Sequence, residues 1–357
     1  MDVSRTRRTL RTTAALGSCC LALVSGCSVP GGGSAEDGST TAQQAAVPVS
    51  VTDLQNQYLK VIKNVLPSVV QIEASRDLGS GVVYDGSGRI VTNAHVVGNE
   101  KTFRVTTANS EEPLTASLVY SYPEQDLAVI RLDKVPDGLK PASFGDTQKV
   151  QVGQITLAMG SPLGLSSSVT EGIVSATGRT VTENPEGGGT GATIANMVQT
   201  SAAINPGNSG GALVDLDGRV IGIPTLAASD PDLGGSAAPG IGFAIPASMV
   251  KTIADQIVKQ GRVTDSGRAA LGVTARTVVD ENYQPAGVAV VSVQPGGAAD
   301  RAGIRTGDII TKVGDDHITT ITSLAVSLAS DRPGQRTTVT YSREGVRRTV
   351  GVTLGGQ

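Results

Sequence analysis

The chain has 357 residues, a formal net charge of −3, 45 glycines and no tryptophan, and 39% of its residues are hydrophobic. This length gives room for two or three domains, and the shortage of aromatic residues requires a core of Val, Ile, Leu and Ala, which favours β-structure. No basic tract follows residue 26, so we expect no nucleic-acid partner. The 3 cysteines all lie within residues 19–27, which excludes disulfides, a thiolate metal site and a cysteine nucleophile from the remainder.

Residues 1–27 have the pattern of an export signal. Arginines between positions 5 and 11 precede an apolar run over 14–25 that is too short to span a bilayer, and VSGC at 24–27 ends it. This ending resembles the lipobox of bacterial lipoproteins, which implies cleavage before Cys27 and a lipid anchor on its sulfur. The alternative is an ordinary secretory signal without lipid, and RR at 7–8 leaves the Sec and Tat routes both open. We therefore expect a lipid-anchored protein at the extracytoplasmic face of the cell membrane.

The next segments predict a tether, a helix and many short strands. Residues 28–52 are rich in Gly, Ser, Ala and Thr, which indicates a flexible tether. DG pairs at 85–86 and 217–218, each between apolar segments, predict two hairpins. Residues 178–192 predict a long loop, and residues 246–260 predict an amphipathic helix that Gly261 ends. An earlier helix over 53–66 is predicted by apolar residues at helical spacing: Leu54, Tyr58, Ile62 and Leu66.

Residues 265–357 predict a separate unit of about 90 residues, near the lower end of usual domain sizes. The strand-like segment GVAVVSV is followed by a short helical AADRAG, a second helix over 322–330 and a hairpin about residues 344–345. Strands mixed with two short helices in this way indicate a compact α+β unit.

Ser209 lies among glycines in INPGNSGGAL at 204–213. Glycine permits positive φ and lets backbone N–H groups approach a ligand without interference from side chains. A serine hydroxyl is a poor nucleophile unless a base removes its proton, and the oxyanion that forms needs pre-aimed donors. The segment therefore predicts a catalytic serine, with a glycine-rich turn as the alternative.

The chain contains two histidines, and their positions separate two orders of catalytic residues. The α/β-hydrolases share the GxSxG pattern but run Ser, acid, His, which leaves only His317, in the separate C-terminal unit. Chymotrypsin-like enzymes run His, Asp, Ser. That order selects His95 in TNAHVV and Asp126 in QDLAVI, ahead of Ser209.

Six motifs follow one another along the chain: LGSGV at 78–82, TNAHVV at 92–97, DLAVI at 126–130, VTEGIVSA at 169–176, INPGNSGGAL at 204–213 and GIGFAIP at 240–246. With these motifs in this order, the chain resembles the HtrA (Deg) family of serine proteases over about residues 55–357. It implies a mainly β protein in which a chymotrypsin-like double β-barrel protease domain over 53–261 precedes a small α+β PDZ domain over 265–357.

The resemblance also implies roles for individual residues. Ser209 is the nucleophile, His95 the general base and then acid, and Asp126 the residue that fixes the imidazole tautomer. The N–H groups of Gly207 and Ser209, with Asn208 between them, form the oxyanion hole. The product is an acyl-enzyme that water hydrolyses, so we expect no metal ion and no organic cofactor.

Substrate-binding residues are assigned by position in the chain. Ala203, six residues before the serine, corresponds to the base of the S1 pocket and implies a small or medium apolar P1 residue, unless a loop shift breaks this correspondence. Ile223 and Thr225 flank Pro224 in the strand expected to pair with substrate. Two positions depart from the family pattern: Pro224 stands where Asn is usual and cannot donate to a β-ladder, and Ser201 stands where Asp is common.

The segment ALGV at 270–273 resembles the carboxylate-binding loop of bacterial PDZ domains. Leu271, Gly272 and Val273 are then expected to hold a peptide C-terminus through their backbone N–H groups. Leu324 and Leu328 either face that groove or belong to the core.

The sequence thus predicts a membrane-anchored serine endoprotease of protein quality control that cleaves unfolded or damaged exported proteins and binds peptide C-termini at its PDZ domain. The family implies a homotrimer arranged through residues 53–66. One alternative is a regulatory protease of a single envelope signalling protein. The other is a peptide-binding chaperone or scaffold with little cleavage, which Ser201 and Pro224 keep open.

Overall fold

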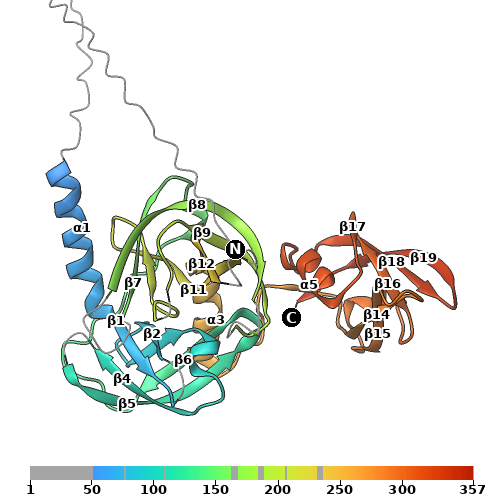
Figure 1. Cartoon of the computed structure of the whole chain (residues 1–357). Coiled ribbons are helices and arrows are strands. Elements are labelled where there is room, and N and C mark those ends of the chain that lie inside the picture. Colours follow the sequence, from blue (N-terminus) through green and yellow to red (C-terminus); the bar gives the residue numbers. More distant parts are fainter. Residues whose placement is uncertain are drawn as a thin grey trace, which may run out of the picture. The chain divides into compact units, whose positions relative to one another are not determined.

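The computed structural model describes residues 51–75, 78–107, 110–161, 168–183, 189–205, 207–230 and 236–356 (Figure 1). The predicted export signal, Cys27 and most of the tether lie outside these ranges. The described chain is mainly β, with two closed six-stranded barrels followed by a smaller α+β unit, which confirms the predicted fold class. Within the described ranges, no helix has the length and apolar character needed to cross a membrane.

The first barrel is built from strands whose small β-branched residues fill its interior. Its strands are joined in the order β1-β2-β3-β6-β5-β4, all antiparallel. Ile72, Ile90 and Ile130 are fully buried in its core, as the aromatic-poor composition requires. The bounds are β1 Val69–Glu73, β2 Leu78–Val83, β3 Arg89–Thr92, β4 Thr102–Thr107, β5 Ser110–Tyr122 and β6 Leu127–Leu132. The predicted hairpin around residues 85–86 is the connection between β2 and β3.

The second barrel closes in the order β10-β11-β12-β9-β8-β7. Its strands are β7 Ile155–Gly160, β8 Ser168–Thr182, β9 Thr193–Thr200, β10 Ala212–Val214, β11 Val220–Asp230 and β12 Ser236–Pro246. The prediction of a long loop over 178–192 was wrong in extent. Strand β8 runs to Thr182, which pairs with Thr193 at the start of β9, so the connection begins five residues later than predicted. β-branched residues on both strands sustain this pairing in spite of the glycines between them.

One helix precedes the double barrel in the chain and a second helix follows it. Helix α1 (Val51–Val65) packs through Val61 and Val65, which are buried in the core shared by the barrels. The predicted stripe of Leu54, Tyr58, Ile62 and Leu66 is only partly buried, so the packing face is rotated from the prediction. Helix α3 (Ala247–Gln260) matches the predicted helix and ends at Gly261 in the left-handed conformation. Short helices are α2 (Ala94–Val97), η1 (Leu66–Ser68), η2 (Pro123–Gln125) and η3 (Thr147–Lys149).

The C-terminal unit has a core of its own. Its main sheet has the order β14-β15-β16-β18-β19, with β17 paired to β16, and β13 pairs with β20. The predicted helix begins at Ile321, where Thr320 and Ser323 form a capping box, and the predicted hairpin about residues 344–345 joins β18 to β19. The bounds are β13 Ala269–Ala270, β14 Val273–Val279, β15 Pro285–Val293, α4 Ala298–Arg301, β16 Ile309–Val313, β17 Asp316–His317, α5 Ile321–Ala329, β18 Arg336–Arg343, β19 Val346–Thr353 and β20 Gly355–Gly356.

Candidate active site

His95 and Asp126 come together from two connections of the first barrel. His95 lies in α2, directly after β3, and Asp126 lies between η2 and β6. Asp126 has a left-handed backbone (φ 48°), which Asp tolerates better than most residues, and this turn directs its carboxyl group inward. The amide side chain of Asn93 donates to the Asp126 carbonyl at 3.0 Å and fixes the turn.

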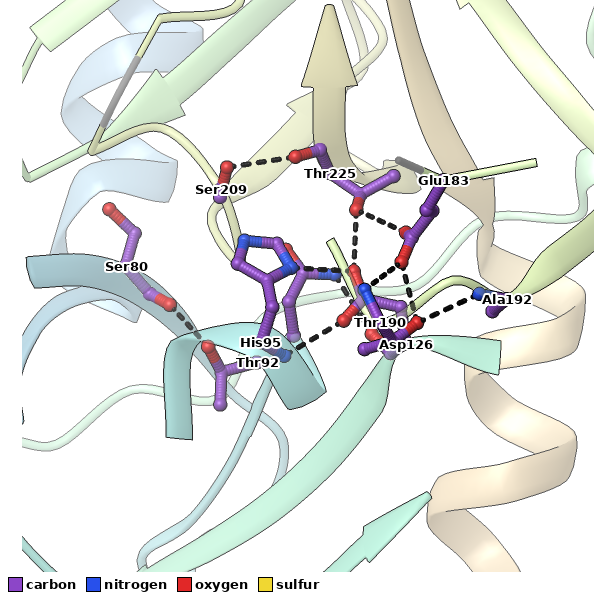
Figure 2. A network of polar contacts seen from close by, with 10 residues as sticks. Ser80, Thr92, His95, Asp126, Glu183, Thr190, Ala192, Ser209 and Thr225 are labelled. Atoms are coloured by element: carbon purple, nitrogen blue, oxygen red, sulfur yellow. Dashed lines mark hydrogen bonds and ion pairs between the residues drawn. The ribbon is translucent and has the colours of Figure 1, made fainter. Parts of the chain in front are cut away.

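The carboxyl group of Asp126 holds His95 at two atoms. Its Oδ2 lies 2.8 Å from His95 Nδ1, and its Oδ1 accepts the backbone N–H of His95 at 2.9 Å. Asp126 is fully buried, whereas His95 is partly exposed. A buried carboxylate bonded to Nδ1–H leaves Nε2 as the basic nitrogen of the neutral ring. Figure 2 shows the imidazole ring between Asp126 and Ser209.

Ser209 lies in the turn before β10. Its hydroxyl donates to the carbonyl oxygen of Thr225 at 2.9 Å, and its own carbonyl accepts the N–H of Ser80 at 2.8 Å. The next residue, Gly210, has φ +80°, and a Cβ there would lie 2.2 Å from the Ser80 carbonyl oxygen. The turn therefore requires glycine at this position because strand β2 is packed directly against it.

The predicted oxyanion hole is built around Gly207, whose φ of 100° favours glycine. The N–H of Asn208 donates to the carbonyl of Asn205 at 3.0 Å, so this amide is engaged and Asn208 serves as the spacer between the two expected donors. On the other side, the carbonyl oxygen of Gly207 accepts the Ser80 hydroxyl at 2.5 Å. Ser80 Oγ in turn accepts the N–H of Ser161 at 2.8 Å, so β2 fixes the loop that carries the predicted donors.

Thr225 lies in β11, and its side chain points into the protein. The register of β11 on β12 shifts between Pro224 and Leu226, and the resulting bulge directs Thr225 into the protein, where it is 4% exposed. Its hydroxyl group lies 2.5 Å from Asp126 Oδ2. The side chain of Thr225 therefore supports the aspartate.

Glu183, which directly follows β8, is a second carboxyl group at the site that the sequence did not indicate. It is 2% exposed, and its Oε1 lies 3.1 Å from Thr225 Oγ1. Burial and the nearby charge of Asp126 raise the pKa of Glu183 to about 7, while hydrogen bonds from Thr190 oppose the rise. In the described ranges, no group of three or more His, Cys, Asp or Glu residues is placed to hold a metal ion.

The other predicted substrate residues divide into exposed and buried positions. Ala203 is exposed, and its carbonyl oxygen accepts the Thr170 hydroxyl at 2.8 Å. The side chain of Ile223 is fully buried in the core. Pro224 lies at the bulge, where a residue without an N–H is tolerated, and its carbonyl accepts from Gly210. Ser201 Oγ accepts the N–H of Ile173 at 3.0 Å, which stabilises the β8–β9 pairing.

In the C-terminal unit, the predicted loop lies between β13 and β14. Leu271 is buried, Gly272 has φ +71°, and Val273 begins β14 beside Val293 of β15. The backbone carbonyl of Leu271 accepts a hydrogen bond from the N–H of Ala299, and the carbonyl of Gly272 accepts one from the N–H of Gln294. The three residues line a groove together with Leu324 and Leu328, of which Leu324 is also a core residue.

Two family models match the chain. The family model for trypsin-like peptidase domains matches residues 79–223, and the model for PDZ domains matches residues 269–354. Serine protease PepD of Mycobacterium tuberculosis is 39% identical over 313 residues, which cover 83% of this chain and 65% of that protein. Serine protease Do-like HtrA of Lactococcus lactis subsp. cremoris is 39% identical over 295 residues, which cover 77% of this chain and 70% of that protein. The chain belongs to the HtrA family of serine proteases.

Solved HtrA-type structures share the fold. The HtrA-type protease AlgW with a decapeptide superposes with a TM-score of 0.57 and 30% identity, covering 84% of this chain and 98% of that one. The chain spans just under two thirds of the length of the mycobacterial relative.

Proposed function

We propose that this HtrA-family chain is a serine endopeptidase in which Ser209 attacks the scissile carbonyl. The observation that supports the proposal is the 2.8 Å contact between Asp126 Oδ2 and His95 Nδ1, on the side of the imidazole ring away from Ser209 (Figure 2). His95 takes the Ser209 proton on Nε2 and then donates it to the leaving amine. Buried Asp126 stabilises the imidazolium that forms between these two steps. The Ser209 hydroxyl, which donates to the Thr225 carbonyl at rest, turns toward the imidazole before attack.

The tetrahedral intermediate places a negative charge on the substrate oxygen. The N–H groups of Gly207 and Ser209 are the expected donors to that oxygen, because the intervening Asn208 amide is already bonded. Water then hydrolyses the acyl-enzyme. In this second half His95 takes a proton from the attacking water and gives it to Ser209 Oγ, so the imidazole is neutral again at the end of each half.

For substrate, we infer an extended, unfolded polypeptide with a small or medium apolar P1 residue. An exposed alanine at position 203 supports this preference, since it offers neither charge nor bulk to a P1 side chain. A chain has to become extended before it can pair with the strands beside the site, which selects unfolded or damaged proteins. Quality control of exported proteins is the function that fits this selection.

The groove between β14 and α5 is proposed to bind peptide C-termini. Gly272 in the left-handed conformation lets the loop turn its N–H groups toward a carboxylate. Leu324 and Leu328 supply apolar contacts for the last side chain of the peptide. Lipid attachment at Cys27, location at the extracytoplasmic face of the membrane and assembly as a homotrimer rest on the sequence and on family resemblance.

A single assay separates this function from its rivals. The protein is incubated with unfolded casein and with a fluorophosphonate probe, beside Ser209→Ala and the exposed control Ser87→Ala. Labelling and degradation in the wild type and in Ser87→Ala, both absent from Ser209→Ala, support the endopeptidase. Binding of casein without cleavage or labelling favours a chaperone or scaffold, and cleavage confined to one native envelope protein favours a regulatory protease.

A further inference from the structure

Two buried carboxyl groups lie on either side of one hydroxyl group at the active site. Asp126 is 0% exposed and Glu183 is 2% exposed, although they come from different barrels. Between them, Thr225 Oγ1 lies 2.5 Å from Asp126 Oδ2 and 3.1 Å from Glu183 Oε1 (Figure 2). Two ionised carboxylates in so small a buried volume repel each other strongly, so one of them is expected to be neutral.

The hydrogen bonds identify which group is neutral. Thr225 has one proton, and its short 2.5 Å contact with Asp126 Oδ2 has the length of a hydroxyl donating to an ionised carboxylate. Asp126 also accepts from His95 at both of its oxygens, which requires the ionised form. The 3.1 Å contact between Glu183 and Thr225 then has no proton unless Glu183 supplies it.

The remaining oxygen of Glu183 agrees with this assignment. Its Oε2 accepts the N–H of Thr190 at 2.8 Å and the hydroxyl of Thr190 at 2.6 Å. Oε2 of Glu183 therefore only accepts hydrogen bonds, whereas Oε1 faces the hydroxyl oxygen of Thr225. This is the arrangement expected of a carboxylic acid that carries its proton on Oε1.

We propose that Glu183 is a positioning residue of the active site: its neutral carboxyl group donates to Thr225 Oγ1 and thereby directs the Thr225 proton to Asp126. The hydrogen bonds run from Glu183 through the Thr225 hydroxyl to Asp126. His95 donates to the same carboxylate of Asp126 from the other side. Glu183 does not touch the reacting atoms, so it acts through Asp126. This inference rests on the proposed endopeptidase function.

The surrounding charges make this donor sensitive to pH. Asp126, from the turn after η2, acts on Glu183 through its charge and through a side-chain hydrogen bond. His95, from α2, is the titratable group on the far side of Asp126. Described residues from the β8–β9 connection and β11 that contact Glu183 are neutral, namely Thr190 and Thr225. Because burial and Asp126 raise the pKa of Glu183 to about 7, the donor is present below neutral pH and lost above it.

Loss of this proton changes the field at His95. Ionised Glu183 adds a second negative charge and competes with Asp126 for the Thr225 proton, so the imidazolium form of His95 is stabilised. Replacement by Gln keeps the shape and an N–H donor but removes the ionisation. The titration of His95 therefore reports on Glu183.

The test uses the fact that the chain has only 2 histidines. The protein is labelled with ¹³C at histidine Cε1, His317→Asn assigns the signals, and His95 is titrated by NMR from pH 5 to 9. In the wild type we expect a curve that departs from a single-proton titration through a second ionisation near pH 7. In Glu183→Gln we expect a single-proton curve with its midpoint lower by about 0.5 pH unit. In a plot of the fluorophosphonate labelling rate against pH, we expect the rise on the acid side to move to lower pH in Glu183→Gln as well.

Two further variants complete the test. Glu171→Gln removes an exposed carboxylate from β8, the strand that precedes Glu183, and leaves the curve unchanged. Thr190→Val removes the side-chain hydrogen bond that favours the ionised form of Glu183, so we expect the second ionisation to move to higher pH. This variant replaces Glu183→Gln in the test if Glu183→Gln does not fold. Superposable single-proton curves for the wild type and for either site variant overturn the proposal. A wild type that fluorophosphonate does not label overturns the proposed function instead, and the NMR titration still decides the role of Glu183.

Discussion

Ser80 and Gly207 join the two barrels at the active site: the hydroxyl of Ser80 donates to the carbonyl oxygen of Gly207 at 2.5 Å, across 127 positions of sequence. The same hydroxyl oxygen accepts the N–H of Ser161, which lies just beyond the end of β7. The backbone N–H of Ser80 reaches the carbonyl of Ser209. The orientation of the Gly207 peptide, and with it the predicted oxyanion hole, therefore depends on a side chain from the first barrel.

Ser80→Ala tests this dependence. The variant leaves the Gly207 carbonyl and the Ser161 N–H without their buried partner, at a cost of about 1–3 kcal/mol in the free energy of unfolding. Without this hydrogen bond, the Gly207 peptide group no longer holds the predicted oxyanion-hole donors in a fixed orientation. We therefore expect the second-order rate of fluorophosphonate labelling to fall by about 10-fold. The control Ser87→Ala, in the exposed β2–β3 turn, is expected to keep the wild-type free energy of unfolding and the wild-type labelling rate. A labelling rate unchanged in Ser80→Ala would show that the loop is held without this hydroxyl.

Thr225 gives a second prediction because its side chain can be changed without changing its shape. Thr225→Val removes the hydroxyl that donates to Asp126 and leaves the buried carboxylate short of a donor. We expect kcat/KM to fall by about 10-fold, corresponding to about 1.4 kcal/mol of transition-state stabilisation. Thr225→Ser retains the donor and most of the activity. Equal losses in the two variants would mean that packing, and not the hydroxyl, is what matters here.

Gly210→Ala is predicted to disrupt the turn that carries the nucleophile. The new Cβ would lie 2.2 Å from the Ser80 carbonyl oxygen and 2.3 Å from Thr92 Oγ1, in a backbone with φ +80°. Neither neighbour is the flexible end of a long side chain, so the turn itself has to move. We expect labelling of Ser209 to fall by more than about 100-fold together with a lower Tm. The control is Gly86→Ala, where a Cβ meets nothing within 4 Å.

The elements of the fold were predictable because their signals are local. Turn residues at 85–86 and 217–218, the helix over 246–260 and the hairpin at 344–345 depend on neighbouring residues, and the structure has all of them. The order of His95, Asp126 and Ser209 followed from motifs. Register was harder to predict, since the face of α1 that packs is set by the barrels and not by the apolar stripe alone.

The polar support of the site could not be predicted because it is made of distant pairs. Glu183 and Thr225 are 42 positions apart and meet only because β11 bulges at Thr225 and β8 ends at Thr182. A bulge leaves no mark in the sequence except a proline at 224, which the sequence suggested as a weakness of substrate pairing. Glu183 lay in a segment predicted to be a loop, where a charged residue attracts no notice.

The last prediction concerns the C-terminal unit, where Asp308 is 1% exposed and its oxygens accept two bonds from Arg343, at 2.6 Å and 2.7 Å. Burial alone would raise the pKa of Asp308, but the bonds from Arg343 and from the N–H of Arg305 outweigh it and lower the pKa below its usual value. A carboxyl group with a lowered folded-state pKa stabilises the fold above its unfolded pKa, and that contribution is lost as pH falls through the folded value.

Arg343→Gln removes the main cause of this lowering, so burial then dominates and the pKa of Asp308 rises. Acid unfolding of the C-terminal unit is therefore expected at a higher pH than in the wild type, with a lower urea midpoint at pH 7 as well. The measurement is a urea titration of the whole protein at pH 7 and at lower pH values, read by a short hydrogen-exchange pulse and mass spectrometry of peptides from 309–343. Arg336→Gln, exposed on the same strand, is the matched control. If Arg343→Gln and Arg336→Gln unfold at the same pH, the buried ion pair is not what protects this unit from acid.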